Sequence, residues 1–142
     1  MQTVKVDQKS LEKYAEEFVA GIKPRNRATV IGLSGDLGAG KTTFAQAVAR
    51  ELGVKESVTS PTFVIEKIYK LENQTFEHLI HIDAYRLESG RELEKIGWRE
   101  IAADPQNLIL IEWPERVAEI LPPDTRKITF KFVDEFTRTI EL

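Results

Sequence analysis

The residues best suited to chemistry lie in one glycine-rich string, which reads Gly35-Asp36-Leu37-Gly38-Ala39-Gly40-Lys41-Thr42-Thr43. The string matches the phosphate-loop pattern, in which a glycine and four further residues precede Gly-Lys-Thr. Glycines let the backbone turn tightly and direct several N–H groups toward phosphate oxygens. The Lys41 ammonium would supply positive charge to the β- and γ-phosphates, and the Thr42 hydroxyl is a candidate Mg²⁺ ligand. The string therefore predicts a nucleotide-binding loop.

Two acidic residues directly follow apolar runs that are typical of buried strands. Asp83 comes after residues 79–82, and Glu112 comes after residues 108–111. Ligands of α/β sheets bind at the carboxyl ends of the strands, and a phosphate loop needs a carboxylate that holds Mg²⁺ directly or through water. Both acids are therefore candidate metal ligands and candidate catalytic residues beside Lys41. One of them could hold the metal while the other orients the attacking group, and the sequence leaves the assignment open.

Several other residues near these strings have two interpretations each. Hydroxyls in segment 59–63 could sense a γ-phosphate as a switch does, or the segment could be a proline turn that begins a strand. Trp113 could pack on a nucleotide or a partner, or lie in the core. Arg86 could pair with phosphate or an acid, or lie in solvent. His81 has the same strand parity as Asp83, and we interpret this histidine as structural.

These candidates need strands and helices to position them. We expect strands at residues 3–6, 28–33, 62–71, 75–82 and 107–111, followed by a terminal β-hairpin formed by 128–132 and 138–142. We expect helices from Asp7 as N-cap to Ile22, at 42–52 after the phosphate loop, at 91–96 with Gly97 as the stop, and at 114–120. The fold class is then α/β, with a mixed sheet flanked by helices in one domain spanning residues 1–142.

Composition excludes several other kinds of site. The 142 residues contain no cysteine, which excludes disulfides, iron–sulfur clusters and thiol nucleophiles, and only two histidines, which argues against a histidine zinc site. No apolar run approaches the roughly 20 residues of a membrane span, and we see no signal peptide, so we expect a cytoplasmic protein. The net charge of −3 argues against sequence-blind binding to DNA or RNA.

The nucleotide chemistry has more than one reading. The chain has no Asn-Lys-x-Asp motif for reading guanine, so a GTPase is disfavoured. A small-molecule kinase is an alternative, although such enzymes normally add a lid and an acceptor domain for which 142 residues leave little room. A nucleotide-gated binding module is another. A compact ATPase that docks on a partner fits best.

Four strings occur in an order that resembles the bacterial TsaE (YjeE) family, the ATPases of tRNA threonylcarbamoyladenosine biosynthesis. They are the phosphate loop through Thr43, Ser60-Pro-Thr-Phe63, His81-Ile-Asp-Ala-Tyr-Arg-Leu87 and Ile111-Glu-Trp-Pro114. Many families share the first string, whereas the other three at this spacing make the match specific. The resemblance runs from the first strand to the terminal hairpin and implies a P-loop fold with a mixed sheet.

The resemblance also implies a function and site roles. It implies an ATPase whose activity is weak in isolation and that docks on the TsaD–TsaB complex. Because that complex modifies adenosine 37 of tRNA, the chain would contact tRNA only indirectly, through the complex. By position, Thr42 and Glu112 would ligate Mg²⁺, and Asp83 would be the acid essential for hydrolysis.

Further nucleotide contacts are implied in the same way. Ser60 and Thr62 would belong to a switch-like loop, and Trp113 would lie near the nucleotide. Arg138 is a candidate contact near the base. The family often has Thr where this chain has Leu11, and Gly-Arg where it has Thr137-Arg138.

Overall fold

A computed structural model of the chain describes residues 3–36, 40–56, 66–132 and 138–141. The described residues form one seven-stranded sheet in the order β1-β7-β6-β2-β5-β4-β3. The strands, in chain order, are β1 (Thr3–Val6), β2 (Thr29–Gly35), β3 (Glu66–Lys70), β4 (His78–Asp83), β5 (Asn107–Glu112), β6 (Arg126–Phe132) and β7 (Arg138–Glu141). All seven strands therefore belong to one sheet, with β1 at one edge and β3 at the other.

The centre of the sheet is parallel, and both flanks are antiparallel. Strand β2 pairs in parallel with β5 and β6, and β5 pairs in parallel with β4. Strand β3 forms a hairpin with β4, and β7 pairs antiparallel with both β6 and β1. These pairings confirm the predicted mixed sheet and the terminal hairpin.

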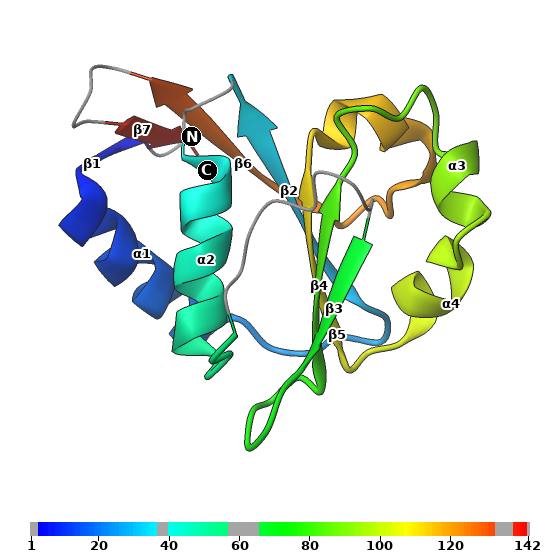
Figure 1. Cartoon of the computed structure of the whole chain (residues 1–142), viewed down its shortest axis with the longest axis horizontal. Coiled ribbons are helices and arrows are strands. Elements are labelled where there is room, and N and C mark those ends of the chain that lie inside the picture. Colours follow the sequence, from blue (N-terminus) through cyan, green and yellow to red (C-terminus); the bar gives the residue numbers. More distant parts are fainter. Residues whose placement is uncertain (1–2, 37–39, 57–65, 133–137, 142) are drawn as a thin grey trace.

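Helices cover both faces of the sheet, as Figure 1 shows. Helices α1 (Gln8–Gly21) and α2 (Lys41–Glu51) pack on one face. The other face is covered by three short elements, α3 (Arg91–Glu94), α4 (Trp98–Ala103) and the 3-10 helix η1 (Pro114–Ile120). None of the described helices is both long and apolar enough to cross a membrane.

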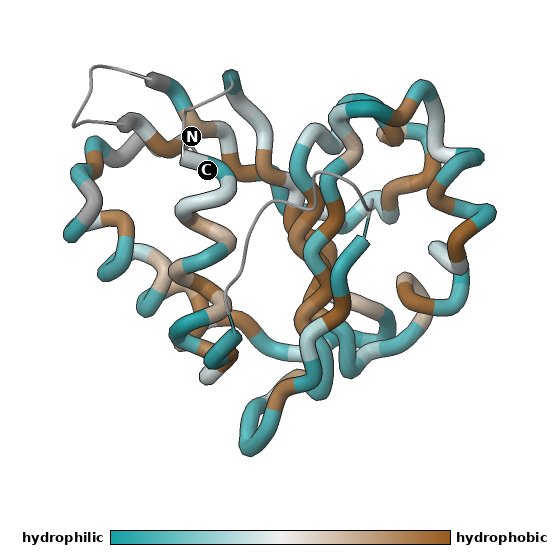
Figure 2. Tube along the Cα trace, in the orientation of Figure 1, coloured by the Kyte–Doolittle hydropathy of each residue, from teal (hydrophilic) through white to brown (hydrophobic). Residues whose placement is uncertain are grey.

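Each face of the sheet has its own apolar core, and the hydropathy trace in Figure 2 shows the central strands as mostly hydrophobic. Phe44 of α2 lies at the centre of the first core, where its ring contacts those of Tyr14, Phe18 and Phe130. Trp98 of α4 packs in the second core. Because alternate side chains of a strand point to opposite faces, Leu110 and Glu112 point toward the α2 side, whereas Ile109 and Ile111 point away from it.

Most expected elements are confirmed within a few residues, with three differences. Strand β4 begins at His78 rather than at Thr75, because residues 72–77 form bends. The first four residues of the expected strand 62–71 lie outside the described residues. The sequence predicts Gly97 only as a helix stop, whereas a further helix, α4, begins directly after it. Gly97 has φ 93° and acts as the N-cap of α4 as well.

Candidate functional site

The carboxyl ends of the central parallel strands meet at one edge of the sheet. Asp83, the last residue of β4, stands opposite Glu112, the last residue of β5. Leu33 of β2 stands on the other side of Glu112, and β2 ends two residues later at Gly35. The two acids and the beginning of the glycine-rich string are therefore brought together by strand register alone.

Glycine is required at both described ends of the phosphate loop. Gly35 has φ 134°, and a Cβ placed there would collide with the carbonyl oxygen of Phe130 on β6. Gly40 has φ 106° and is the N-cap of α2. Such positive φ angles are strained for residues that carry a Cβ. The loop joins the end of β2 to the start of α2, where the free N–H groups of the first helical turn favour anions. Leu37, Gly38 and Ala39 lie outside the described residues.

Lys41 lies inward at the first position of α2, and only 5% of its surface is exposed. Its ammonium donates a hydrogen bond to the carbonyl oxygen of Gly35 and lies 3.6 Å from the centroid of the Trp113 ring. Burial lowers the pKa of Lys41, and nearby carboxylates, Glu112 first among them, oppose that shift. The positive charge is thus held beside the loop at some cost in desolvation.

Thr42, Glu112 and His81 form a connected polar cluster beneath the loop. The Thr42 hydroxyl donates to the Glu112 carboxylate, with oxygen distances of 3.1 and 3.4 Å. The Nε2 atom of His81 lies 2.7 Å from Oε2 of Glu112. Glu112 is 3% exposed and His81 is 1% exposed. The sequence predicts a structural histidine at position 81, and the structure adds a contact with Glu112 that the sequence does not indicate.

The Thr42 and Glu112 pair has the chemistry that Mg²⁺ prefers. Mg²⁺ takes oxygen ligands and is usually held by one or two carboxylates together with substrate phosphates and waters. A hydroxyl and a carboxylate already lie within contact distance at the start of α2. No cluster of three or more acidic, histidine or cysteine side chains suited to a metal occurs among the described residues. The pair therefore offers one hydroxyl and one carboxylate oxygen to a metal that nucleotide phosphates also hold.

Asp83 is more open than Glu112. It is half-buried at the end of β4, and its Oδ1 accepts a hydrogen bond of 3.0 Å from the backbone N–H of Tyr85. That bond closes a short turn after the strand and fixes the direction of the carboxylate. Asp83 therefore lies at the same sheet edge as Glu112 but is more exposed to solvent.

Trp113 follows Glu112 in an unusual backbone conformation. Its φ of 60° and ψ of 52° are left-handed, and only one other non-glycine residue in the described ranges, Asn73, has a positive φ. This conformation carries the chain from β5 into η1, and the Trp113 ring lies between Lys41 and Tyr85, whose ring centroid is 5.0 Å away. The Arg116 guanidinium lies over the Tyr85 ring, 5.7 Å from its centroid. Two packed aromatic rings, those of Trp113 and Tyr85, therefore lie beside the lysine of the loop.

Some predicted site residues are not brought together by the described structure. Asp36 and Thr43 are in place at the two ends of the loop. Ser60 and Thr62 lie outside the described residues. Arg138 begins β7, which β6 separates from β2, and the position of its side chain is not described.

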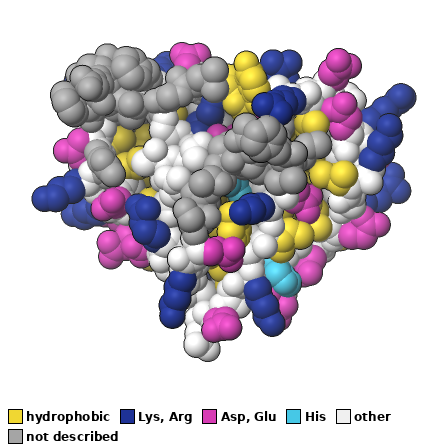
Figure 3. All heavy atoms as spheres, viewed as in Figure 1, with side chains coloured by type: hydrophobic (Ala, Val, Ile, Leu, Met, Phe, Trp, Pro, Cys, Tyr) yellow, Lys and Arg dark blue, Asp and Glu magenta, His cyan; other side chains and the backbone are white. Residues whose placement is uncertain are grey.

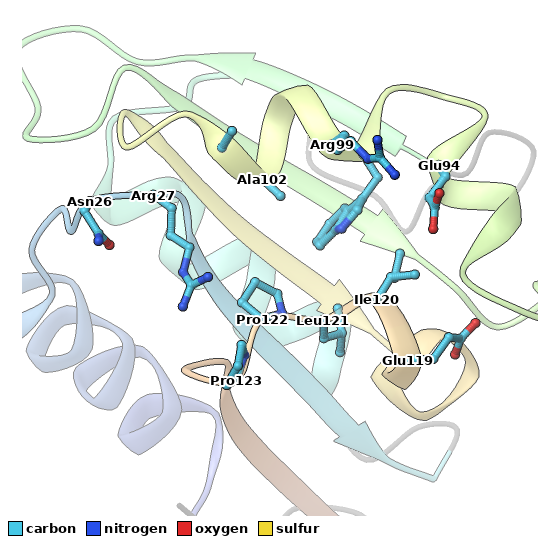
Figure 4. A pocket seen from close by; sticks show the side chains of 12 residues that line it. Asn26, Arg27, Glu94, Arg99, Ala102, Glu119, Ile120, Leu121, Pro122 and Pro123 are labelled. Carbon is cyan, nitrogen blue, oxygen red and sulfur yellow. The ribbon is translucent and has the colours of Figure 1, made fainter.

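A separate groove of about 790 Å³ lies beside α4 and η1, and its lining includes none of the predicted site residues. Figure 4 shows Arg27, Arg99, Glu94 and Glu119 around it, with Pro122 at one side. The groove thus carries both signs of charge. Figure 3 shows the same mixture over one whole face of the molecule, with basic and acidic side chains interspersed.

Comparison with known proteins points to one family. The profile described as "Threonylcarbamoyl adenosine biosynthesis protein TsaE" matches residues 6–140. A tRNA threonylcarbamoyladenosine biosynthesis protein TsaE from Rickettsia typhi is 35% identical over 92% of this chain and 86% of its own length. The protein of that name from Borreliella burgdorferi is 42% identical over 78% of this chain and 77% of its own.

A solved structure agrees with the sequence comparison. The crystal structure of Bacillus subtilis YdiB is 30% identical to this chain and covers 98% of it, with 83% of its own chain matched and a TM-score of 0.75. The predicted fold class is therefore confirmed: a P-loop α/β fold with a mixed, helix-flanked sheet and a terminal β-hairpin.

Proposed function

The chain belongs to the TsaE family and acts in tRNA threonylcarbamoyladenosine biosynthesis, and from that premise we propose that it is a P-loop ATPase. The single observation that carries this proposal is the contact between Thr42, directly after the phosphate-loop lysine, and Glu112 at the end of β5. It joins the glycine-rich string to a buried carboxylate, which is the pairing that ATP with Mg²⁺ requires. We take residues 1–142 as one ATPase domain in the cytoplasm.

The phosphate loop binds the nucleotide. The glycine-rich string would offer backbone N–H groups to the phosphates, and the start of α2 would add its dipole. Lys41 and Thr43 follow on the first turn of that helix. The Lys41 ammonium is already at the loop, where the Gly35 carbonyl and the Trp113 ring hold it. Because Lys41 is buried, its interaction with a phosphate is weakly screened by water and correspondingly strong.

Thr42 and Glu112 would hold Mg²⁺, with Asp83 as a possible further ligand through water. When bound, the ion neutralises charge on the β- and γ-phosphates. The hydroxyl and the carboxylate now share a hydrogen bond, so both oxygens are already directed to one place. That arrangement reduces the side-chain entropy lost on binding.

Asp83 is the proposed catalytic carboxylate for ATP hydrolysis. Water attacks the γ-phosphorus, the bond from that phosphorus to the bridging oxygen breaks, and ADP and inorganic phosphate leave. Asp83 would orient the water and accept its proton. The half-buried position beside Glu112 leaves the carboxylate open to water, and the turn to Tyr85 holds its direction.

Three further groups complete the proposed site. Trp113 would border the nucleotide, since its ring covers Lys41. Ser60 and Thr62 would respond to the γ-phosphate, and Arg138 would lie near the base. These three assignments rest on the family resemblance of the surrounding strings.

The partner would be the TsaD–TsaB complex, and tRNA would be met only through it. Support comes from family membership and from the surface charge, because basic and acidic side chains are interspersed among the described residues in Figure 3. ATP hydrolysis would serve the turnover of that complex.

Reconstitution tests this function. The chain is mixed with TsaD, TsaB, threonylcarbamoyl adenylate, ATP, Mg²⁺ and unmodified tRNA, and modified tRNA is counted per complex. We expect repeated turnovers only when the chain and ATP are both present. Equal turnover without the chain would contradict the proposal, and phosphate transfer to a metabolite without any partner would favour a kinase.

A further inference from the structure

His81 is a buried polar residue whose contacts tie it to the proposed metal site. It lies within β4, two residues before Asp83, and β4 is a parallel neighbour of β5. Leu110 is opposite His81 in the register, so Glu112 is the next residue of β5 on the same face. The 2.7 Å contact between His81 Nε2 and Glu112 Oε2 is this diagonal pair.

The direction of that hydrogen bond follows from the chemistry of the two groups. An ionised carboxylate can only accept hydrogen bonds, so His81 donates through an Nε2–H group. Thr42 is the other donor to this carboxylate among the described residues. A buried charge needs such partners, because leaving it without them costs several kcal/mol. His81 and Thr42 are the two side-chain donors that the structure places on this carboxylate.

The two donors are closest to different oxygens of the carboxylate. His81 contacts Oε2, whereas the shorter Thr42 contact is to Oε1, at 3.1 Å. His81 thus fixes the rotation of the carboxylate and turns Oε1 toward the hydroxyl that begins α2. The ring itself cannot rotate freely, since only 1% of His81 is exposed.

We propose that His81 is a positioning residue for the nucleotide-bound metal, because it orients the Glu112 carboxylate that faces Thr42. This inference rests on the proposed function, in which Glu112 and Thr42 hold Mg²⁺. Hydrogen-bond partners of metal ligands typically contribute about 10–100-fold to metal affinity. His81 is not a catalytic residue, because it acts only through Glu112.

The test measures how strongly metal and nucleotide binding are coupled. The affinity of the full chain for a non-hydrolysable ATP analogue is measured by calorimetry in EDTA and again in saturating Mg²⁺, and the ratio is the coupling. We expect His81→Ala to lower this ratio about 10–100-fold while the affinity in EDTA stays unchanged. A residue that only fills the core would change the unfolding temperature and leave the ratio alone.

Two polar variants cover the case in which His81→Ala does not fold. The amide nitrogen of glutamine is as many bonds from Cα as Nε2 of histidine, so His81→Gln should restore the coupling. The amide nitrogen of asparagine corresponds to Nδ1, so His81→Asn should not. His78→Ala, at the other end of β4, is the matched control and should keep the wild-type ratio.

The outcomes separate the two proposals. If the wild-type chain shows coupling and the His81→Ala and His81→Asn variants show the same coupling, the inference is wrong and the proposed function stands. If the wild-type chain binds no nucleotide, or binds it equally with and without Mg²⁺, both are wrong.

Discussion

The carboxyl ends of β4 and β5 differ in their surroundings although both strands end on an acidic residue. Each strand ends on an acid, and the two acids stand opposite each other in the sheet. Glu112 is buried and its carboxylate contacts two side chains, Thr42 and His81. Asp83 is half-buried, and its carboxylate closes a backbone turn at Tyr85. Register therefore places two carboxylates side by side, and their surroundings give them different chemistry.

The backbone beyond each acid differs as well. After Glu112 the chain passes through Trp113 in a left-handed conformation and enters η1, while after Asp83 it continues through Ala84 without a positive φ. The strained turn brings an aromatic ring over Lys41. Strain of this kind persists where surrounding structure holds it, and it often marks functional sites. In the proposed function, the end of β5 at Glu112 (the rigid end) would hold the metal, and the end of β4 at Asp83 (the open end) would orient the attacking water.

The largest expected effect tests the open end. Asp83→Asn should lower the rate of ATP hydrolysis about 10²–10⁴-fold, because the amide cannot accept the proton of the attacking water. The affinity for ATP with Mg²⁺ should change little, since the loop and Glu112 are intact. Single-turnover hydrolysis and calorimetry measure the two quantities. A variant that hydrolyses ATP at the wild-type rate would remove Asp83 from the chemistry.

The rigid end should respond in binding. Glu112→Gln removes the negative charge but retains the shape, so we expect the affinity for Mg²⁺ with nucleotide to fall by more than the about 10–100-fold expected when a ligand's hydrogen-bond partner is lost. Binding in EDTA should persist. Titration of Mg²⁺ at fixed nucleotide measures this. If Glu112→Gln and Asp83→Asn showed the same defects, the two ends would not differ in role.

Lys41 links both ends to the loop and should show a conflict between binding and stability. Lys41→Met should abolish nucleotide binding and raise the stability of the nucleotide-free protein at neutral pH. Burial lowers the pKa of Lys41 below 10.5, so the unfolded chain holds the proton more tightly, and wild-type stability rises with pH as the lysine deprotonates. The advantage of Lys41→Met should therefore shrink as pH approaches 10.5, an outcome that urea unfolding across the alkaline range measures. If the difference in unfolding free energy between Lys41→Met and the wild type did not change with pH, burial of the Lys41 charge would not destabilise the fold.

The smallest effect tests the backbone contrast. At Trp113, the Gly variant should be more stable than the Ala variant by about 1 kcal/mol, because glycine adopts the left-handed conformation without strain. At Ala84 the order should reverse, and Ala84→Gly should cost about 0.5–1 kcal/mol or more, because glycine loses more backbone entropy on folding. Urea unfolding midpoints of the three variants measure this. The same order at both positions would contradict a strained Trp113.

The sequence predicted the frame of the site well. The apolar runs before Asp83 and Glu112 and the Gly-Lys-Thr string are local signals, and local patterning suffices to place an acid at a strand end. The strand boundaries at His78 and the helix at Trp98–Ala103 were missed, because short segments are decided by what they pack against. Trp98 is held by the second core rather than by helical periodicity.

The partners within the site were harder to predict. The contact between His81 and Glu112 depends on β4 and β5 being parallel neighbours in one register, which no single strand encodes. The available signal was parity: His81 lies two residues before Asp83, on the same strand face. The left-handed backbone of Trp113 had no local signal, because tryptophan does not favour that conformation.

The order of the strands in the sheet has a consequence for synthesis on the ribosome. Strand β2, which carries the loop, pairs only with β5 and β6, and both follow it in the chain. Strand β1, made first, pairs with β7, where Thr3 stands opposite Glu141. Such distant pairings form slowly, because a long loop must close before any contact compensates for it. A nascent chain that has emerged only as far as α2 therefore carries the full phosphate-loop sequence without the sheet that supports it. The proposed nucleotide would then stabilise the protein only late in its synthesis.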